Sequence, residues 1–418
     1  MASFSFLHAA DLHLDSPLIG LSGRSPDFAA RVEDASRTAL DALVQLAIDE
    51  GCRFVLLSGD VFDGDLRNIR AGLFLVSRLA RLREAGVRVY MILGNHDAEN
   101  RFMAKLDFSD NVTLFSARAA HTATLPEIDV AIHGRSFPQR DVTENLAQTY
   151  PPPVAGAFNI GLLHTACIGH EGEHAAYAPC SVQQLVNHGY DYWALGHIHD
   201  RGLLNERPYV VYPGNLQGRS ARETGAKGAT LVRVQDGAVE SLEHRTLDAV
   251  RWAHERVDVG GATTSAEALG RLRDAMERAG EAAEGRPLAL RLTLAGETPL
   301  HGELALRRAE LREEAETIAA GLSAEVWLEK LSLATRAPKA TEAAPDPTVA
   351  GRIQAEIAAL PAEALADKLE ARIAEIRARL PASARAEALL EALRAEAPAR
   401  ARALALALVG EGRDDALR

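Results

Sequence analysis

The sequence predicts an α/β fold built as a layered sandwich, and three features of the chain point to it. Strand and helix patterns alternate over residues 4–93, and short strands dominate residues 112–244. A second alternation of strands and helices begins near residue 250 and is followed by an Ala-rich helical segment. At 418 residues the chain is too long for one ordinary domain, so we expect two or three.

The first segment reads strand, helix, strand, helix, strand. Residues 4–9 suit a strand, and residues 28–48 carry apolar side chains at helical spacing. The continuous apolar run at 54–57 predicts a buried strand, residues 68–84 are again helical, and residues 87–93 suit a third strand. This order is typical of a parallel α/β core.

The remaining elements divide the chain further. Strands are expected at 112–116, 129–133, 158–163, 190–195, 208–212, 229–234 and 238–244. A strand near Val257, helices at 264–283 and 302–320, and strands at 288–294 and 325–333 read β-α-β-α-β, a small separate domain. Pro and Ala content marks 337–347 as a linker. The predicted regions are 1–248, 249–336, 337–347 and a helical tail at 348–418.

Bulk composition narrows the class of protein. No window is apolar enough for a membrane span, and the N-terminus lacks the pattern of a signal peptide. Three scattered cysteines argue against a disulfide scaffold, so we expect a cytoplasmic protein. The net charge of −12 disfavours a nucleic-acid partner unless a local basic patch or bound cations supply the attraction.

Five short motifs follow or end apolar strands. They are Asp11-Leu12-His13, Gly59-Asp60-Val61-Phe62-Asp63, Gly94-Asn95-His96-Asp97, Gly161-Leu162-Leu163-His164 and Gly196-His197-Ile198-His199. Each alone has an ordinary explanation, such as a turn or a surface histidine. In an open α/β sheet, however, ligands bind where the carboxyl ends of the strands meet. The ordered combination therefore predicts that these side chains converge on one site.

The residue types suit a pair of metal ions. Asp11 and His13, two apart on an extended chain, should point the same way, and His197 and His199 repeat the spacing. Asp60 has two oxygens and can bridge two cations.

Asn95 adds a neutral oxygen to this set and His164 adds a nitrogen. Mixed imidazole and carboxylate ligands suit Mn, Fe, Zn, Co or Ni better than Ca or Mg. We expect two divalent metal ions, with Mn²⁺ as the first candidate and Fe, Zn or Co as alternatives. Two ions about 3.5–4 Å apart can activate a water and stabilise a phosphoester's attacking and leaving oxygens.

This motif order resembles that of the calcineurin-like metallophosphoesterases. Within them it is similar to the DNA-repair exonuclease branch, the SbcD type, and most of all to YhaO-type proteins. The segments 10–17 and 212–219 carry the finer match, which covers about residues 1–245 and extends more loosely over 250–335. The resemblance implies an αββα sandwich, a small capping domain, and hydrolysis of DNA phosphodiester bonds.

The resemblance also implies roles for single residues. The first metal would be held by Asp11, His13, Asp60 and His199, and the second by Asp60, Asn95, His164 and His197. His96 would contact the scissile phosphate and assist the leaving oxygen, while Asp97 would orient its ring. Asp63 stands where some DNA-cutting relatives carry a histidine, so the resemblance gives it no role.

Other candidates surround these motifs. Arg219, Arg222 and Lys227 follow a loop that should face the site, and they are candidates for DNA phosphate contacts; a solvated charged loop is the alternative. His170 and His174 either line the site or belong to a mobile loop.

The tail carries apolar residues at helical spacing, interrupted by three prolines. Its helices either pack on each other or dock onto a partner. The resemblance implies docking onto a coiled-coil ATPase and a possible homodimer. The predicted function is a metal-dependent DNA exonuclease or endonuclease of a repair complex. The alternatives are a phosphodiesterase or phosphatase acting on small esters, and a scaffold with a degenerate site.

Overall fold

A computed structural model of the chain describes residues 3–16, 34–64, 69–98, 106–170, 175–338, 349–360 and 366–379, with single positions and short stretches besides. Its first compact unit comprises Met1–His254, Ala279–Leu290 and Ser323–Glu329, and its second comprises Glu255–Arg278, Arg291–Leu322 and Lys330–Arg418. Because chain segments alternate between these units, the domain boundaries drawn from the sequence stay predictions. The expected linker lies almost wholly outside the described residues.

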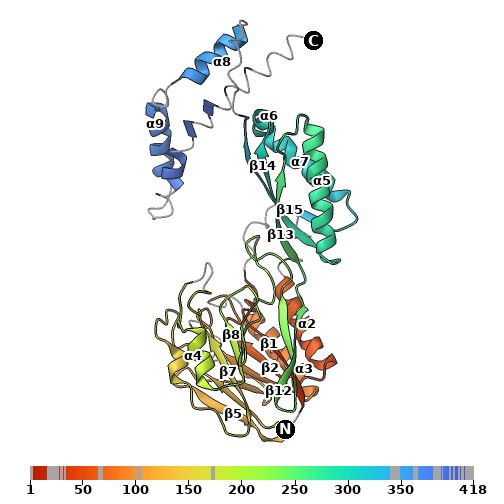
Figure 1. Ribbon diagram of the computed structural model, residues 1–418, viewed down its shortest axis with the longest axis vertical. Helices are drawn as coiled ribbons and strands as arrows, with labels where there is room; N and C mark the ends of the chain where they lie inside the picture. The colour runs from red at the N-terminus through yellow and green to blue at the C-terminus, as the bar shows by residue number, and fades with distance from the viewer. Residues whose placement is uncertain are drawn as a thin grey trace. The chain divides into compact units, whose positions relative to one another are not determined.

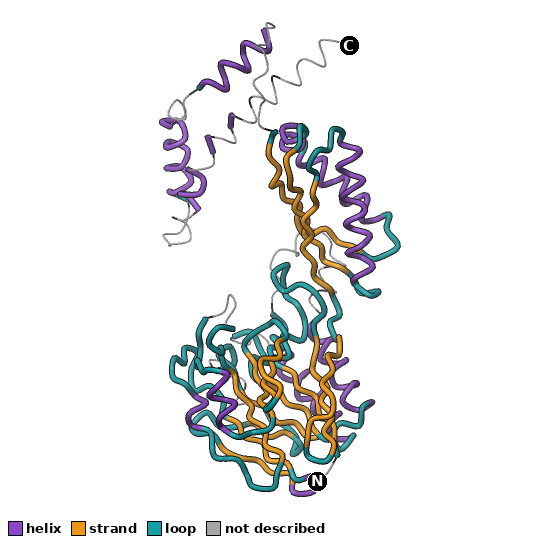
Figure 2. Tube along the Cα trace, viewed as in Figure 1, coloured by secondary structure: helices purple, strands orange, loops and turns teal. Residues whose placement is uncertain are grey.

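The first unit contains two six-stranded sheets (Figures 1 and 2). One has the order β12-β11-β1-β2-β3-β4, formed by Ala238–Thr246, Gly228–Gln235, Phe4–Ala9, Phe54–Ser58, Arg88–Ile92 and Val112–Leu114. The other has the order β5-β6-β7-β8-β10-β9, formed by His121–Leu125, Val130–Gly134, Phe158–His164, Tyr192–Gly196, Tyr209–Tyr212 and Gly202–Glu206. Strands β1 to β4 pair in parallel, as do β6, β7, β8 and β10, so each sheet has an edge where carboxyl ends meet.

Apolar side chains from both sheets meet in one core. Phe6, Phe54 and Tyr90 of the first sheet lie in the same buried cluster as Ile160 and Tyr192 of the second. The rings of Phe6 and Phe54 stack at 4.9 Å, and Tyr192 meets Phe6 edge-on at 5.3 Å. Burial of such aromatic surface is the main force that holds the two sheets face to face.

Helices cover the outer faces of the sandwich (Figure 1). The amphipathic helices α2 (Ala35–Asp49) and α3 (Ile69–Glu84) bury their apolar sides against the outer face of the first sheet. The short helix α4 (Val182–His188) packs Leu185 into the cluster on the outer face of the second sheet, beside the 3-10 turn η3 (Leu146–Thr149). A further 3-10 turn, η2 (Pro126–Ile128), joins β5 to β6. The αββα sandwich expected from the sequence is confirmed.

A separate aromatic cluster in the first unit joins residues far apart in sequence. Phe28, Trp252 and Ala289 are buried together, and Trp327 stacks on Phe28 with ring centroids 4.7 Å apart. The Trp252 indole N–H donates to the carbonyl of Gly218 at 2.9 Å. This cluster, which we call the Trp252 brace, supports the loop after β10.

The remaining strands form a three-stranded sheet in the order β13-β14-β15, with bounds Arg251–Asp258, Leu288–Glu297 and Val326–Arg336. Helix α5 (Ser265–Ala282) follows β13, and helices α6 (His301–Leu306) and α7 (Arg308–Ala320) follow β14. The sequence predicted a single helix at 302–320. The structure breaks it at Arg307, which is the C-cap of α6 and the N-cap of α7.

The tail contains α8 (Val349–Ala359), α9 (Ala366–Arg377) and helical residues at 387 and 389–394. Ile373 of α9 and Leu390 are each at most 2% exposed, and Arg394 Nε lies 2.6 Å from the Glu370 carboxylate. The α9 segment therefore packs within the tail, whereas Ile353 of α8 and the following Leu360 are each 45% exposed. Among the helices that the structure describes, none is long and apolar enough to cross a membrane.

Candidate metal centre

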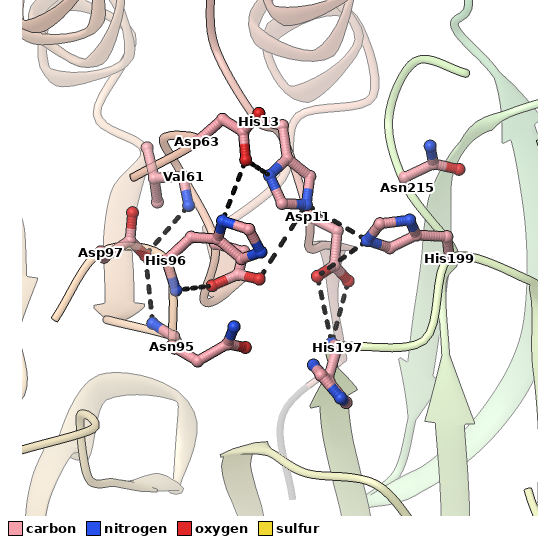
Figure 3. Close-up of polar contacts among 12 residues, drawn as sticks. Asp11, His13, Val61, Asp63, Asn95, His96, Asp97, His197, His199 and Asn215 are labelled. Atoms are coloured by element: carbon pink, nitrogen blue, oxygen red, sulfur yellow. Dashed lines mark hydrogen bonds and ion pairs between the residues drawn. The ribbon is translucent and has the colours of Figure 1, made fainter. Parts of the chain in front are cut away.

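The five motifs lie where strands of the two sheets end, and Figure 3 shows residues from four of them. Asp11, Asp60 and Asn95 follow β1, β2 and β3, His164 is the last residue of β7, and His197 follows β8. Because β1, β2 and β3 run parallel, as do β7 and β8, their carboxyl ends bring these side chains to the same edge of the sandwich. The expected convergence is what the structure shows.

The ligand-type side chains fall into three neighbouring groups, within each of which one donor atom per residue lies within 4.8 Å of the others. The groups are Asp11 with His13 and His199, His13 with Asp60 and His96, and Asp60 with His164 and His197. Asn95 joins the last group, since its Oδ1 lies 3.0 Å from His164 Nε2. Asp60 belongs to two groups, as a carboxylate shared between two cations would.

The backbone reaches this arrangement through an uncommon conformation. Asp11, His13, Asp60 and His197 have φ values of 52°, 42°, 51° and 99°, in the left-handed region that non-glycine residues rarely adopt. The expectation that Asp11 and His13 lie on an extended chain is therefore wrong; the chain curls between them. Backbone strain of this kind persists where packing and function over-determine it.

Two glycines make room for the ligands. A Cβ at Gly94 would collide with the Asp60 carboxylate, and one at Gly196 would collide with the carbonyl of Ser58. The glycine before Asn95 and the glycine before His197 are therefore required by close approach. Each sits at a strand end, where a side chain would force the neighbouring ligand loop outward.

In three of the site histidines, one ring nitrogen forms a hydrogen bond with a residue that is not one of the expected metal ligands. The partners of His164 Nδ1, His197 Nε2 and His199 Nδ1 are Ser58 O at 2.9 Å, Ala175 O at 2.8 Å and Glu223 Oε1 at 2.7 Å. Each partner is an oxygen that only accepts, so the histidine nitrogen carries the hydrogen. When the ring is neutral, the opposite nitrogen has the lone pair that binds a metal.

Two of these inward nitrogens lie close to other ligand-type atoms. His199 Nε2 lies 3.1 Å from His13 Nε2, and His164 Nε2 lies 3.0 Å from Asn95 Oδ1. Each pair needs either a hydrogen on one of its two atoms or a cation that both atoms bind. The donor set therefore fits divalent metal ions, with borderline nitrogen and hard oxygen ligands together.

The charges of the buried groups favour the same conclusion. Burial raises the pKa of Asp11 to about 6, although nearby His199 opposes the shift. Burial works to lower the pKa of His164, but the charge of Asp60 and a hydrogen bond with it raise that pKa to about 9. Carboxylates removed from water need a counter-charge, and a cation supplies it more completely than a histidine proton does.

His96 lies beside the ligands and is paired with Asp63. Its Nδ1 is 2.9 Å from Asp63 Oδ1, and its backbone N–H donates to Asp60 Oδ1 at 2.9 Å. Burial works to lower the pKa of His96, but the hydrogen bond with Asp63 and the charge of Asp60 raise it above its usual 6.5. With Nδ1 committed to Asp63, Nε2 is the nitrogen that can meet a substrate.

The prediction that Asp97 orients the His96 ring is wrong. The Asp97 carboxylate accepts backbone N–H bonds from Val61, Phe62 and Gly94 at 3.0, 2.8 and 3.0 Å, and it is 1% exposed (Figure 3). It ties the loop after β2 to the loop after β3. Asp63 takes the orienting position, held in turn by the Ser16 hydroxyl at 2.7 Å.

The three basic residues expected to contact DNA phosphates differ in their exposure and in their partners. Arg219 Nη2 is 3.1 Å from Glu223 Oε1, and its Nη1 is 3.7 Å from Asp63 Oδ1. Lys227 is 5% exposed and donates to the backbone oxygen of His199 at 2.9 Å, so the phosphate contact considered for it is wrong. Arg222 is exposed. Among the other candidates His170 is exposed, and His174 lies outside the described residues.

Sequence reasoning missed Glu223 altogether. Glu223 bonds His199, and its only sequence signal is its position four residues after Arg219 in a charged loop. The signal for Asp63 was stronger, because the second aspartate of Gly-Asp-x-x-Asp follows the strand that presents Asp60.

Comparisons with known proteins agree with this geometry. A model of the calcineurin-like phosphoesterases matches residues 4–201, and a model of the middle domain of the metallophosphoesterase YhaO matches residues 252–336. The metallophosphoesterase YhaO of Bacillus subtilis is 37% identical over 303 residues, which cover 72% of this chain and 73% of that protein.

More distant relatives are named as DNA double-strand break repair proteins. Mre11 of Methanopyrus kandleri is 25% identical over 297 residues, covering 64% of this chain and 62% of that protein. Mre11 of Sulfurisphaera tokodaii is 26% identical, covering 59% of this chain and 64% of that protein. A solved dimetal phosphatase of Danio rerio covers 56% of this chain and 93% of its own at 14% identity, with a TM-score of 0.36.

Proposed function

The chain belongs to the calcineurin-like phosphoesterase family and is a phosphoester hydrolase, and on this premise we propose that its substrate is the phosphodiester backbone of DNA. The observation that carries the proposal is the geometry of the centre. Asp60 belongs to two of the three ligand-type groups, and His96, which belongs to one of those two, is paired with Asp63. The similarity to Mre11 proteins, which are named for DNA repair, supports DNA over small esters as the substrate.

The first ion would be held by Asp11, His13, Asp60 and His199, and the second by Asp60, Asn95, His164 and His197. We propose Mn²⁺, with Fe, Zn or Co as other metals that this ligand set accommodates. Two such ions supply Lewis-acid activation of water and of the phosphate oxygens.

His96 acts on the phosphate directly. Its backbone N–H bond to Asp60 fixes the position of the ring relative to the shared carboxylate. Asp63 holds Nδ1, so a proton on Nε2 can be donated to the departing sugar oxygen. The hydrogen bond with Asp63 and the charge of Asp60 raise the pKa of His96, which favours the protonated ring. Arg219 and Arg222 were the predicted contacts for the DNA backbone, and the exposed Arg222 retains that proposed role.

We also propose that the tail docks onto a coiled-coil ATPase, in a complex that acts in DNA repair. The apolar side chains of Ile353 in helix α8 and of Leu360, which follows the helix, support this, because both are exposed. The buried Ile373 belongs to the tail's own packing, so α8 is the docking element to test rather than α9.

The test of DNA as substrate compares substrates with one enzyme preparation. The full-length protein, stripped with chelator and reloaded with Mn²⁺, is assayed on end-labelled duplex and single-stranded DNA, and on bis(p-nitrophenyl) phosphate. We expect DNA cleavage that needs metal and that weakens as salt rises, because counterions are released on binding. The His96→Ala variant should retain both metals by elemental analysis and lose cleavage.

Two results would contradict the proposal. Undiminished activity in metal-free enzyme would rule out the metal centre. Rapid turnover of the small ester without cleavage of any DNA, even with the partner ATPase present, would favour a phosphodiesterase or phosphatase of small esters.

A further inference from the structure

The loop between β10 and β11 places a carboxylate behind one of the site histidines. Glu223 Oε1 lies 2.7 Å from His199 Nδ1, and the Glu223 side chain is only 14% exposed. A carboxylate can only accept a hydrogen bond, so this contact places the ring hydrogen on Nδ1. The His199 Nε2 lone pair then points inward, 3.1 Å from His13 Nε2 and 3.8 Å from Asp11 Oδ1.

This arrangement sets His199 apart from the other two histidines with an outward partner. His164 and His197 give their outward nitrogens to the backbone carbonyls of Ser58 and Ala175. A carbonyl fixes the tautomer but carries no net charge, whereas a carboxylate also makes the ring a stronger donor to a metal. His199 therefore has the anionic support within this group of three.

The loop holds Glu223 through both of its oxygens. The backbone N–H of Arg219 and the Asn215 side-chain amide donate to Oε2 at 2.7 and 2.9 Å. The Arg219 guanidinium donates to Oε1 at 3.1 Å. Because three donors from one loop converge on it, the carboxylate cannot rotate away from His199 without breaking several bonds.

The same guanidinium reaches the support of a second histidine. Arg219 Nη1 lies 3.7 Å from Asp63 Oδ1, the oxygen that is 2.9 Å from His96 Nδ1. One cation thus lies between the two carboxylates that back His199 and His96. Its side chain is 23% exposed, so much of its charge is committed to these partners rather than presented to solvent.

We propose that Glu223 is the positioning residue of His199 and that Arg219 is the cation that holds Glu223 and Asp63 in place. Glu223 keeps His199 in the Nδ1–H tautomer that directs Nε2 into the metal centre. Arg219 then acts through these carboxylates, a role different from the DNA phosphate contact that the sequence suggested. The inference rests on the metal centre of the proposed function, but not on the identity of the substrate.

The first experiment reads the tautomer in metal-free protein. Long-range ¹H–¹⁵N spectra distinguish Nδ1–H from Nε2–H, and the His199 signals are identified by their loss in a His199→Gln variant. In wild type we expect the Nδ1–H tautomer. Glu223→Leu removes the acceptor and should give a mixture or the Nε2–H form, whereas Glu223→Gln keeps an acceptor oxygen and should largely retain Nδ1–H.

The second experiment measures Mn²⁺ affinity by competition with a fluorescent chelator. Loss of such a supporting partner typically weakens metal affinity about 10–100-fold. We expect that loss at one of two sites in Glu223→Gln and Glu223→Leu. Glu50→Gln is the matched control, because Glu50 also pairs with two arginines, Arg233 and Arg245, away from the centre. Its affinities should equal those of wild type.

Arg219→Gln separates the two roles of the arginine. A positioning role predicts weaker Mn²⁺ binding and slower hydrolysis of bis(p-nitrophenyl) phosphate as well as of DNA. A pure phosphate contact predicts unchanged metal affinity with weaker DNA binding, and that outcome would refute the role assigned to Arg219.

The inference about Glu223 fails if the His199 tautomer and both Mn²⁺ affinities are the same in wild type, Glu223→Gln and Glu223→Leu. A wild-type protein that binds two Mn²⁺ ions without cutting DNA overturns the proposed substrate instead. The two failures are distinguishable because the tautomer and affinity measurements involve no substrate.

Discussion

Replacing Asp63 by asparagine tests the histidine–aspartate pair at the edge of the metal centre. The substitution preserves the size of the side chain and removes its charge. It breaks the charged contact to His96 Nδ1 at 2.9 Å, while the Ser16 hydroxyl can still bond the amide. Asp63 is not in any of the three ligand-type groups, so both metals should still bind.

The expected fall in kcat follows from the hydrogen bond between Asp63 and His96 that is lost. A hydrogen bond to a charged group contributes about 1.5–3 kcal/mol. At about 1.4 kcal/mol for each factor of ten, kcat should fall roughly 10- to 150-fold, with little change in KM. The pKa of His96 should also fall, because the hydrogen bond with Asp63 works to raise it.

The pH profile gives the sign of that shift. A proton donor is active below its pKa, and a raised pKa extends activity to higher pH. In Asp63→Asn the alkaline limb of kcat, measured on a labelled DNA oligonucleotide whose leaving group is a sugar oxygen, should therefore move to lower pH. Asp41→Asn is the control, because it removes a carboxylate of α2 that pairs with Arg78. It should leave both kcat and the alkaline limb of the pH profile unchanged. An Asp63→Asn enzyme with wild-type kcat and an unmoved limb would refute the reasoning.

Three further predictions concern stability and the tail. Asp97→Ala removes the acceptor for three buried backbone N–H groups. It should lower the free energy of unfolding, measured in urea, by about 2–4 kcal/mol. A loss below about 0.5 kcal/mol would contradict the role of Asp97 in joining the two loops. Burial lowers the pKa of His8 to about 3, so between that value and about 6.5 the unfolded chain binds one proton more than the folded chain. The free energy of unfolding therefore falls as pH falls. Between pH 7 and 5, the metal-free His8→Gln variant should lose about 2 kcal/mol less of this free energy than metal-free wild type. Parallel plots of the free energy of unfolding against pH would disprove this. Ile353→Glu should abolish binding to the partner ATPase with metal content and ester hydrolysis unchanged, and retained co-purification would exclude α8 as the docking element.

The sequence predicted the sandwich and its convergent edge because the ligands follow strongly apolar strands. Strands such as β2 and β7 are buried along their whole length, so they are recognised as nearly continuous apolar runs. By contrast β5 and β9 are edge strands of the second sheet with partly exposed side chains, and α4 has seven residues. Such short or edge elements carry too little pattern to be recognised.

The site was predicted less completely than the fold. Asp97 directly follows His96 in sequence, yet the φ of 51° at Asp60 is part of a sharp turn that brings Asp63 to the ring instead. Glu223 is supplied by a loop, and a loop has no period from which its direction can be inferred. Ligands at or just after strand ends were therefore predictable, while the histidine partners of Asp63 and Glu223 were not.

The Trp252 brace has a consequence for the order in which the chain acquires its structure. Gln217 donates to the carbonyl of Val250 at 2.7 Å and Trp252 donates to that of Gly218, so the loop that carries Arg219 and Glu223 rests on this cluster. Trp327, on β15, completes the cluster by stacking on Phe28. During synthesis, the catalytic unit therefore lacks its last supporting ring until more than three quarters of the chain has left the ribosome. A polypeptide that ended at residue 248 would contain the metal ligands, but the loop beside them would lack the support of Trp252 and Trp327. Replacing the chain after residue 248 with another domain would remove the same support.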